Sequence, residues 1–462
     1  MKVRTISIAA LAAATLFASC NKDNGIVSDE KGDPTLMTVS INFPKGPQTR
    51  STVTDDPFAT DGEAKINHID VFIYNSMTGS FLSHTNLTGD DFTKKPNSDD
   101  RDRYDVTATI PTTTGNRIVF AGINLPEGLV SEFKNKPVDA LANVPQEMGK
   151  ADLTGSSENS FAMFSVEGVE KSFTVDETAN KVTLVCQRLV AKVTVEQAPK
   201  MEVNGISGAL INLEYGINNF NKKTFLLQGT APYKKDPNWA KGSYNEAEFV
   251  QLADFSDYKS VAEFVDNYTV SSAPLYVSEN TSEGKTKREL TRATVRGQII
   301  PKEVAHWDGA TLSHNPNSNY PNDPASFYSV IGSIYDGTYY FIDETMANEF
   351  AAYKNDELGY TGDREIKPIK YTDGSCYWDI FLNKTPRTPN GPENKWDVLR
   401  NDFYRCKITH ITTPGRSGPD LEDGGGGGTG PDVPPDAENT NISVDIEILF
   451  WNVLDVEPYE LY

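Results

Sequence analysis

Cysteine and histidine are scarce in this chain of 462 residues, which has 4 Cys and 5 His. The histidines show neither i, i+4 nor His-x-His spacing, and no Cys-x-x-Cys pair occurs, so neither a zinc site nor a histidine-based catalytic site is indicated. Nucleophile-elbow, HExxH and P-loop motifs are also missing from the sequence, and the glycines of residues 424–430 lie in an acidic tail and do not connect a strand to a helix, so they form no phosphate-binding loop. We therefore expect no enzymatic activity, no catalytic residues, no metal site and no cofactor.

Basic residues are outnumbered, because 43 Lys and Arg stand against 65 Asp and Glu, for a formal net charge of -22. Such a chain repels nucleic-acid phosphates and anionic lipid headgroups, so no nucleic-acid partner is expected. The hydrophobic fraction of 38% is sufficient for folded domains, and the length allows two or three of them. Aromatic residues at 10% favour a β-rich extracellular protein.

Long apolar runs are absent except near the start, where residues 6–17 follow the basic Lys2 and Arg4. Twelve residues cannot cross a hydrocarbon core of about 30 Å, so this run is typical of an export signal, not of a membrane anchor. Two small residues then precede Cys20. The order resembles a bacterial lipobox of the looser Bacteroidia type, in which Cys20 carries a diacylglyceryl group. Ordinary secretion without a lipid is the alternative.

The other three cysteines are Cys186, Cys376 and Cys406, an odd number at wide spacing that forms no disulfide framework. Cys376 and Cys406 both lie in strand-like runs and could face each other across a sheet. A bridge between these two residues and a pair of buried free thiols both fit the sequence.

Short alternating runs separated by clusters of Asn, Asp, Gly and Pro make up most of the chain. The expected strands are residues 69–74, 104–110, 117–123, 181–185, 190–195, 209–215, 294–300, 327–334, 338–342 and 377–382. Helical patterns occur only at residues 138–148, 258–267 and 344–354. Many strands with so few helices predict an all-β protein built from β-sandwich modules.

A boundary near residues 198–200 is expected to divide the chain into an N-terminal sandwich, residues 51–200, and a C-terminal sandwich, residues 201–418. Residues 419–438 contain five consecutive glycines among Asp, Glu and Pro, a composition typical of a flexible tether. Residues 439–462 follow this tether. The second module also has polar insertions, in which His306, Trp307, Asp308 and Tyr320 could form a sugar-binding loop or simply pack together.

Two segments have the clearest strand alternation. Within residues 439–462, the apolar positions are Ile442, Val444, Ile446, Ile448 and Phe450. Shortly after the export signal, the apolar positions are Met37, Val39, Ile41 and Phe43. Each set lies on one face of its strand, with polar residues opposite, so we expect two similar edge strands near the two ends of the chain.

The first of these strands is followed by a Pro- and Gly-containing segment with Arg50 and Ser51, where proteolysis is expected. Cleavage there would free the strand from the module that it completes. The opened groove could then accept a strand from another chain by β-augmentation. Because donor and acceptor lie at different places on each subunit, the contact would be head-to-tail and build a filament. The alternative is that both strands stay in their own sandwiches.

Several motifs resemble those of fimbrillins, the subunits of type V pili, and especially the major subunit of the minor fimbria. They span nearly the whole chain: the lipobox at Cys20, the cleavage site Arg50-Ser51, Arg188-Leu189-Val190-Ala191-Lys192-Val193, Tyr276-Val277-Ser278-Glu279-Asn280-Thr281, Ala293-Thr294-Val295-Arg296-Gly297-Gln298-Ile299-Ile300-Pro301, Arg400-Asn401-Asp402-Phe403-Tyr404-Arg405 and Trp451-Asn452-Val453.

The resemblance implies two transthyretin-like β-sandwich domains in tandem and a structural subunit for adhesion. It implies delivery to the outer membrane as a lipoprotein precursor, with residues 1–20 as signal peptide and residues 21–50 as propeptide. An arginine-specific protease would cut after Arg50, and residues 439–462 of a neighbouring subunit would replace the removed strand in an extracellular fimbrium. A tip or accessory adhesin that binds a host or bacterial surface ligand, and a surface glycan-binding lipoprotein, are the alternatives.

Overall fold

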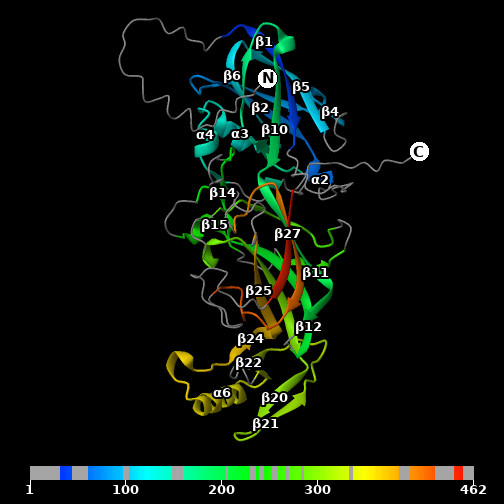
Figure 1. Ribbon diagram of the computed structural model, residues 1–462, viewed down its shortest axis with the longest axis vertical. Helices are drawn as coiled ribbons and strands as arrows, with labels where there is room; N and C mark the ends of the chain where they lie inside the picture. The colour runs from blue at the N-terminus through cyan, green and yellow to red at the C-terminus, as the bar shows by residue number, and fades with distance from the viewer. Residues whose placement is uncertain are drawn as a thin grey trace, which may run out of the picture.

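The computed structural model describes residues 32–43, 61–96, 104–147, 153–154, 160–203, 207–228, 236–238, 244–251, 258–265, 270–281, 286–331, 337–383, 396–421 and 442–450. The predicted all-β character is confirmed, because strands dominate and helices are few and mostly short. Two β regions and a smaller region around helix α6 (Glu344–Leu358) follow one another along the long axis (Figure 1). Among the described residues, no helix is both long and apolar enough to span a bilayer.

The first β region is one hydrogen-bonded sheet in the order β3-β2-β6-β8-β10-β1-β5-β4, with β9 also paired to β6. Its strands are β1 (Pro34–Asn42), β2 (His68–Asn75), β3 (Phe81–Thr88), β4 (Thr93–Pro96), β5 (Tyr104–Thr113), β6 (Gly115–Ile123), β8 (Met163–Ser165), β9 (Val169–Phe173) and β10 (Lys181–Arg188). Strand β10 joins the two halves, since its start pairs with β1 and its end with β8. Both halves contribute side chains to one hydrophobic core.

Three short helices accompany this sheet: α2 (Asp61–Ala64), α3 (Glu127–Phe133) and α4 (Ala140–Asn143). Helix α3 buries Leu129, Val130 and Phe133 in the same core. The helix expected at residues 138–148 is wrong for most of that length, because α4 ends at Asn143 and β7 (Gln146–Glu147) pairs with β14 (Lys223–Thr224).

The second β region consists of two sheets around a second core. One sheet has the order β17-β11-β26-β27, with β18 also on β11, and the other has the order β16-β12-β19-β25. Their strands are β11 (Val190–Val203), β12 (Gly208–Asn218), β16 (Lys259–Ser260), β17 (Ala262–Glu263), β18 (Leu275–Ser278), β19 (Arg292–Pro301), β25 (Ser375–Phe381), β26 (Asp402–Ile411) and β27 (Ile442–Phe450). A short pair, β13 (Phe220–Asn221) and β15 (Phe249–Val250), lies outside both sheets.

The change from one core to the other occurs at a single residue between two strands. Leu189 separates β10 from β11; Val190 still belongs to the first core, while Ala191 already belongs to the second. The boundary expected near residues 198–200 therefore falls inside β11, which is one continuous strand. Pairing with the second region begins at Val190 opposite Ser278 of β18, directly after Leu189, so the break between β10 and β11 and the change of pairing partners coincide.

The third region is inserted between β19 and β25 and contains α6, a β20 (Glu303–Trp307) and β21 (Leu312–Pro316) hairpin, and the sheet β23 (Thr338–Phe341), β22 (Phe327–Ile331) and β24 (Ile369–Tyr371). The helix expected at residues 344–354 is confirmed by α6. Asp343 caps its first turn by accepting a hydrogen bond from the Met346 N–H, and Gly359 ends it with a positive φ of 67°.

All the expected strands overlap strands of the structure, whereas the helix expected at residues 258–267 is wrong. That segment contains β16 and β17, which pair with β12 and β11 at the edges of the two sheets. Its apolar residues follow a helix-like spacing, yet Phe264 is buried beneath the guanidinium of Arg405, 3.9 Å from its ring centroid. Sheet-edge pairing and this stacking outweigh a weak local preference for helix.

Candidate functional site

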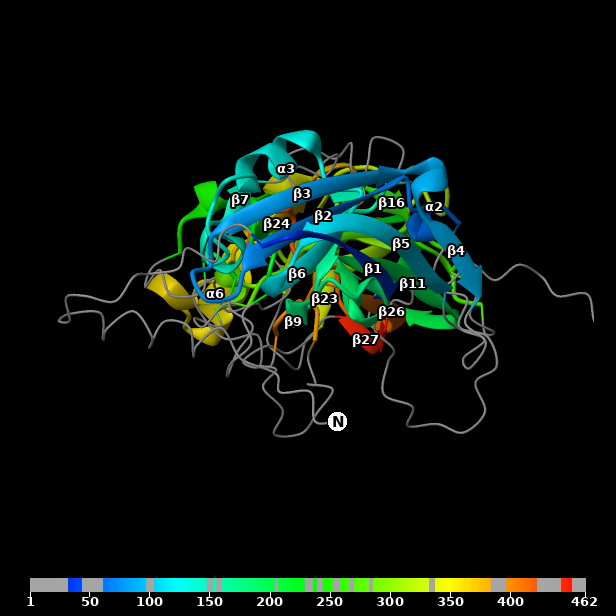
Figure 2. The same cartoon turned by 90° about the horizontal axis from the view of Figure 1, so that it is seen from above.

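Strand β1 is an interior strand, and the expectation of an edge strand is wrong here. Residues Pro34–Ile41 pair antiparallel with β5, and Thr38–Asn42 pair parallel with β10. Figure 2 shows β1 running beside β5 within the sheet. The reason is the parallel pairing with β10, a neighbour more than 130 residues away that strand alternation cannot reveal. Without β1, β5 and β10 would each lose a partner, and a slot would open inside the sheet.

The side chains of β1 alternate as the sequence predicts. Met37, Val39, Ile41 and Phe43 are buried in the first core, while the intervening side chains are at least partly exposed. The slot that β1 fills is therefore apolar on its inner side and lined along both edges by backbone hydrogen-bonding groups. We call this slot the β1 groove.

Polar contacts fix the start of β1 in the groove. The Thr35 hydroxyl donates to the Thr174 carbonyl over 2.9 Å. The side-chain amide of Asn180 lies 3.1 Å from the Thr35 oxygen and 3.0 Å from the Leu36 carbonyl. The Thr38 N–H in turn donates to the Asn180 carbonyl over 2.8 Å. Asn180 is fully buried. This one residue outside β1 therefore binds three groups of the strand: the Thr35 hydroxyl, the Leu36 carbonyl and the Thr38 N–H.

Strand β27, which contains the candidate donor residues, lies at the edge of the second region and pairs antiparallel with β26. Ile442 is buried in the second core, whereas Val444 and Ile446 are only partly buried against it. Ile448 and Phe450 stand in register with Tyr404 and Asp402. The edge position expected for this strand is confirmed.

The end of β27 lies where the two β regions meet. Leu449 is in register with Phe403, which is in register with Lys192 near the start of β11. The chain therefore leaves β27 at the level of the transition between the two cores. Residues 451–462 and residues 422–441, which include most of the tether (419–438), lie outside the described residues.

Buried charges cluster at this same transition, drawn from motifs far apart in the sequence. Glu63 of α2 pairs with Lys192 over 2.8 Å and accepts a hydrogen bond from the Tyr276 hydroxyl over 2.6 Å. The Arg188 guanidinium donates to the Glu63 carbonyl over 3.0 Å. Burial lowers the pKa of Arg188 to about 10 and also lowers the pKa of Lys192, with the Glu63 carboxylate opposing both shifts.

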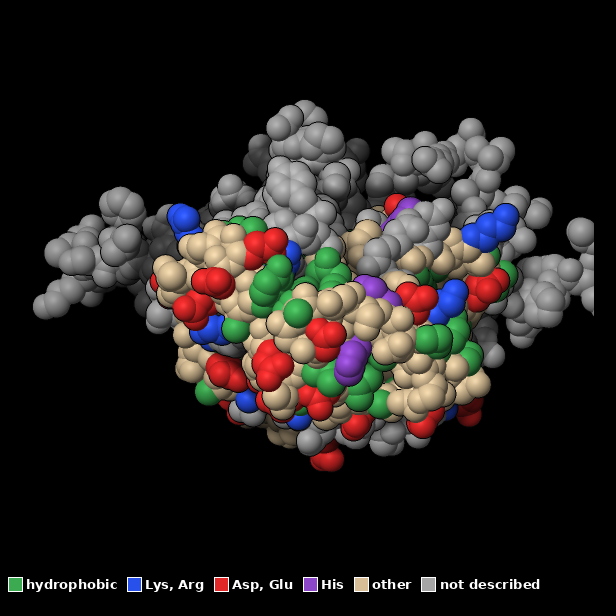
Figure 3. Space-filling model, turned by 90° about the horizontal axis from the view of Figure 1, so that it is seen from below, with side chains coloured by type: hydrophobic (Ala, Val, Ile, Leu, Met, Phe, Trp, Pro, Cys, Tyr) green, Lys and Arg blue, Asp and Glu red, His purple; other side chains and the backbone are tan. Residues whose placement is uncertain are grey.

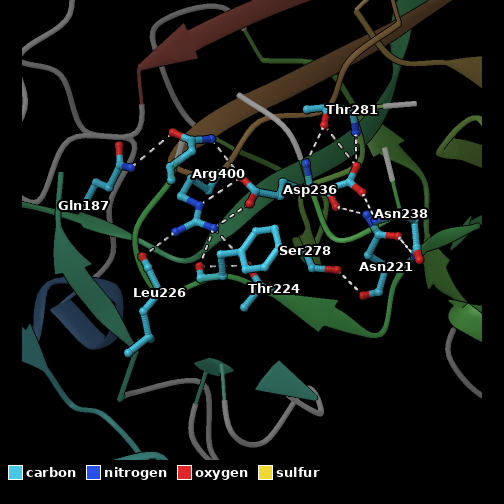
Figure 4. Close-up of polar contacts among 12 residues, drawn as sticks. Gln187, Asn221, Thr224, Leu226, Asp236, Asn238, Ser278, Thr281 and Arg400 are labelled. Carbon is cyan, nitrogen blue, oxygen red and sulfur yellow. Dashed lines mark hydrogen bonds and ion pairs between the residues drawn. The ribbon is translucent and has the colours of Figure 1, made fainter. Parts of the chain in front are cut away.

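A second buried ion pair joins Arg400 and Glu279, and Figure 4 shows the polar contacts around Arg400. Arg400 donates through Nε to a Glu279 oxygen over 2.9 Å and through Nη1 to the Leu226 carbonyl over 2.9 Å. Gln228 donates to the same Glu279 oxygen over 2.8 Å, and Gln187 at the end of β10 donates to Gln228 over 3.4 Å. Both charged side chains are essentially fully buried. Strand β10 of the first region is thus linked by hydrogen bonds to the second region.

Three of the motifs quoted for the family resemblance therefore meet in one place, which we call the junction network: Arg188, Lys192, Tyr276, Glu279 and Arg400, together with Glu63. Glu63 belongs to none of the motifs and was missed by sequence reasoning. Its position in a four-residue helix gave no periodic signal, and its partners are 125 and more residues away.

The other predicted site residues lie apart from this network. Cys186, Cys376 and Cys406 are buried free thiols, so the structure has no bridge between the last two. Burial raises the pKa of Cys186 to about 12 and also raises those of Cys376 and Cys406. Cys20, Arg50 and Ser51 lie outside the described residues.

The candidate sugar-binding loop has its largest aromatic ring turned inward. Trp307 is buried, with its ring centroid 5.3 Å from that of Phe350 and 4.8 Å from that of Tyr353, both on α6. Tyr320 is partly exposed on a separate turn. Figure 3 shows the end of the molecule that carries the α6 region, where acidic and apolar side chains are interspersed. Trp307 therefore has a packing role, and no stacking face of it is available to a sugar ring.

Comparison with known proteins adds two family matches. Residues 37–208 match the family of the major fimbrial subunit protein FimA, and residues 369–457 match the C-terminal family of the type IV major fimbrial subunit protein, fimbrillin. Together the two matches cover more than half of the chain, including most of β1, all of β27, and the junction-network residues Glu63, Arg188, Lys192 and Arg400, whereas Tyr276 and Glu279 lie between the two matches. The chain belongs to the fimbrillin family. This fimbrillin is a structural subunit of a surface fimbria and assembles with other fimbrial subunits.

Solved structures with similar chains include a fimbrilin, a candidate cell adhesion protein and a tip fimbrial protein. A fimbrilin (FimA) from Porphyromonas gingivalis W83 is 13% identical, with 90% of this fimbrillin and 99% of that chain covered and a TM-score of 0.47. A candidate cell adhesion protein from Parabacteroides distasonis is 12% identical, with 91% and 98% covered and a TM-score of 0.48. The tip fimbrial protein Mfa3 from P. gingivalis is 15% identical, with 90% and 100% covered and a TM-score of 0.37. No curated protein matches the sequence significantly.

Proposed function

We propose that this fimbrillin is exported as a lipoprotein precursor, cleaved after Arg50, and polymerised by strand exchange through the β1 groove. Lipid on Cys20 would hold the precursor at the outer membrane. An arginine-specific protease would release residues 21–50 with β1, and a neighbouring subunit would fill the groove. The observation that carries this proposal is the interior position of β1, which completes the first core. Its covalent connection to the strands that follow runs only through residues 44–60, which contain Arg50.

The energetics of the groove explain why it would be refilled. Burying a side chain of this size contributes about 1.5–3 kcal/mol, so Met37, Val39, Ile41 and Phe43 together contribute roughly 6–12 kcal/mol before ordering costs. Loss of β1 would expose these contacts and the backbone groups of β5 and β10. An open groove is therefore unstable in isolation and binds any strand with matching alternation.

Residues 442–450, with the apolar side chains of Ile442, Val444, Ile446, Ile448 and Phe450, are the proposed donor. In its own subunit, β27 has one described neighbour, β26. It can therefore leave the sheet without unpairing any other described strand. In the groove it would have two neighbours, β5 and β10. Val444 and Ile446 are only partly buried at home, whereas the groove buries Val39 and Ile41 completely. More pairing and deeper burial both favour the exchange.

The same geometry makes the contact head-to-tail. The groove belongs to the first β region and the donor to the second, so each subunit carries one of each at different places. A contact of this kind does not close on itself and extends into a filament. The proposed functional division is a signal peptide (1–20), a propeptide (21–50), a groove-bearing first module, a second module up to residue 418, a tether (419–438) and a donor region (439–462), with the module boundary at Leu189.

Mass spectrometry of the N-terminus of fimbriae collected from the cell surface tests this proposal. We expect the mature chain to begin at Ser51. An Arg50→Ala variant should accumulate as a lipidated monomer that begins at Cys20. Surface fimbriae whose subunits still begin at lipidated Cys20 would refute the cleavage step, and with it the opening of the groove.

A further inference from the structure

The inner face of β1 is not entirely apolar, because its first buried position is Thr35. This side chain is 6% exposed and is followed at the next inward positions by Met37, Val39 and Ile41, which are 1–2% exposed. The groove therefore has a polar end and an apolar remainder. A hydroxyl at the polar end requires hydrogen-bond partners in the groove, since burial without them is unfavourable.

The polar end is built for such a hydroxyl. The Thr35 oxygen donates to the Thr174 carbonyl over 2.9 Å and accepts from the Asn180 amide over 3.1 Å. Asn180 itself is 0% exposed and is held by its other side-chain atoms, because its oxygen accepts from the Thr174 N–H over 3.0 Å and its amide reaches the Thr174 carbonyl over 2.8 Å. When β1 leaves, this preorganised donor and acceptor remain at the end of the groove.

A polar end can fix the register of an alternating strand, which could otherwise bind the groove in several registers. Sliding such a strand by two residues keeps the same side chains facing inward, so apolar subsites alone discriminate weakly between registers. With Asn180 in place, a slip by two puts either an apolar side chain against its amide or a hydroxyl into an apolar subsite. Each leaves a buried polar group unpaired. A single buried Asn fixes the register of coiled coils in a comparable way.

The tail of the chain repeats the order of polar and apolar inward positions. In β1 the order is Thr35, Met37, Val39, Ile41 and Phe43, each two residues apart. In the tail it is Thr440, Ile442, Val444, Ile446 and Ile448, with the same spacing. A threonine thus stands two residues before the first apolar position in both segments.

We propose that Asn180 and Thr174 form a register-setting subsite of the β1 groove, and that Thr440 of a second copy of this chain occupies it. The inference rests on the proposed strand exchange and adds its register and direction. The incoming strand runs as β1 does, parallel to β10. Residue 445 of the second copy then takes the place of Ser40, opposite Thr107 of β5.

Disulfide trapping in full-length precursor cleaved by an arginine-specific protease tests this register. We expect Asp445→Cys to cross-link with Thr107→Cys between subunits. Two other pairs report a slip by two residues: Asp445→Cys with Thr109→Cys, since Thr109 lies opposite Thr38, and Ser443→Cys with Thr107→Cys. The native Cys186, Cys376 and Cys406 are buried, and Cys20 leaves with the propeptide, so the introduced thiols dominate the chemistry.

Substitutions at the subsite should then redistribute the cross-links. We expect Asn180→Leu and, independently, Thr440→Val to lower the ratio of in-register to slipped cross-links by about tenfold or more, the factor that one unpaired buried polar group corresponds to. Thr440→Ser keeps the hydroxyl and should preserve the ratio. Ser443→Ala, on the opposite face of the strand, is the matched control. Because Thr440 belongs to the proposed donor segment and not to the groove, its variants remain informative if Asn180→Leu fails to fold.

The outcomes separate this inference from the proposed function. Polymers that form with cross-links in register, but with a ratio unchanged by Asn180→Leu and Thr440→Val, overturn the register role. Polymers without the 445–107 cross-link overturn the direction or the donor segment. If no polymer forms after complete cleavage, and no pair cross-links, then strand exchange itself is wrong.

Discussion

Lys192 and Glu63 form an ion pair of 2.8 Å in which both side chains are almost fully buried, at 2% and 0% exposure. Lys192 belongs to the first strand of the second region, and Glu63 to the first helix after the proposed cleavage site. The pair thus anchors the start of the mature chain at the transition between the two cores. Tyr276 and Arg188 also donate hydrogen bonds to Glu63.

Removing one partner of this pair should destabilise the protein strongly. We expect Lys192→Met to lower the free energy of unfolding by about 3–5 kcal/mol, because the Glu63 carboxylate would remain buried without its cation. Urea unfolding monitored by tryptophan fluorescence measures this. The matched control is Glu132→Gln in α3, whose ion pair with Lys136 is 37–44% exposed and should contribute at most about 1 kcal/mol. Equal effects of the two variants would contradict a structural role for the junction.

Replacing the guanidinium of Arg400 by the ammonium group of a lysine should destabilise the protein. Arg400 donates in several directions, to Glu279, to Thr224 and to the Leu226 carbonyl, which a lysine ammonium cannot reproduce. We expect Arg400→Lys to lower the free energy of unfolding by at least about 2 kcal/mol. Arg364→Lys, on an exposed short 3-10 turn, should leave it unchanged. Thermal unfolding of both variants under one set of conditions makes the comparison.

An acidic residue on the inner face of either strand should block assembly. We expect Ile446→Asp to leave mature subunits folded but monomeric, because it would place an unpaired charge in the groove of the next subunit. The outward-facing Asp445→Asn is the control and should assemble normally. Deletion of residues 439–462 should have the same effect as Ile446→Asp. SDS-resistant ladders of normal length from either variant, detected on a gel, would contradict the donor assignment.

The first region should show a pH dependence that originates at Asp70. Hydrogen bonds from His68 and His84 outweigh burial and lower the pKa of Asp70 to about 2, while the hydrogen bond to Asp70 raises the pKa of His68 above 6.5. The His68 contribution to stability is fully present below pH 6.5 and is lost as pH rises through its raised pKa. The Asp70 contribution is present above about pH 4 and is lost as pH falls towards 2.

We therefore expect wild type to gain more stability than His68→Gln when the pH is lowered from 8.5 to 5.5. The exposed His306 gives the control variant, His306→Gln, which should behave as wild type. Chemical unfolding at both pH values gives the change in stability for each of the three proteins. An identical gain in wild type and His68→Gln would show that the His68–Asp70 contact contributes nothing to the pH dependence.

The three core cysteines should be unreactive in the folded protein. Their pKa values are raised by burial, and the structure has all three as free thiols. We expect no alkylation of mature native protein by iodoacetamide at pH 7.5 and three alkylations after unfolding without reductant. A count of one after unfolding would instead indicate a disulfide bridge and contradict the free thiols of the structure.

Local pattern in the sequence was sufficient for the expected strands, for helix α6 and for the inner face of β1, although it failed for the helices expected at residues 138–148 and 258–267. Alternation placed Met37, Val39 and Ile41 on one face of a strand, and the structure buries that face. Asp343 and Gly359 define the ends of α6 through capping and a left-handed turn, both of which depend on neighbouring residues. These features involve interactions over a few residues, so the sequence by itself determined them.

Partners distant in the chain were decided by the tertiary structure alone. Alternation shows which face of β1 is buried but not that β10 and β5 lie on its two sides. The transition between cores falls at Leu189, between β10 and β11, because pairing with β18 of the second region begins at the next residue, Val190. Glu63, Lys192 and Tyr276 meet across separations of 129 and 213 residues, and no local signal encodes such a contact. Desolvation and pairing in the folded chain select these contacts, so they exist only once the chain has folded.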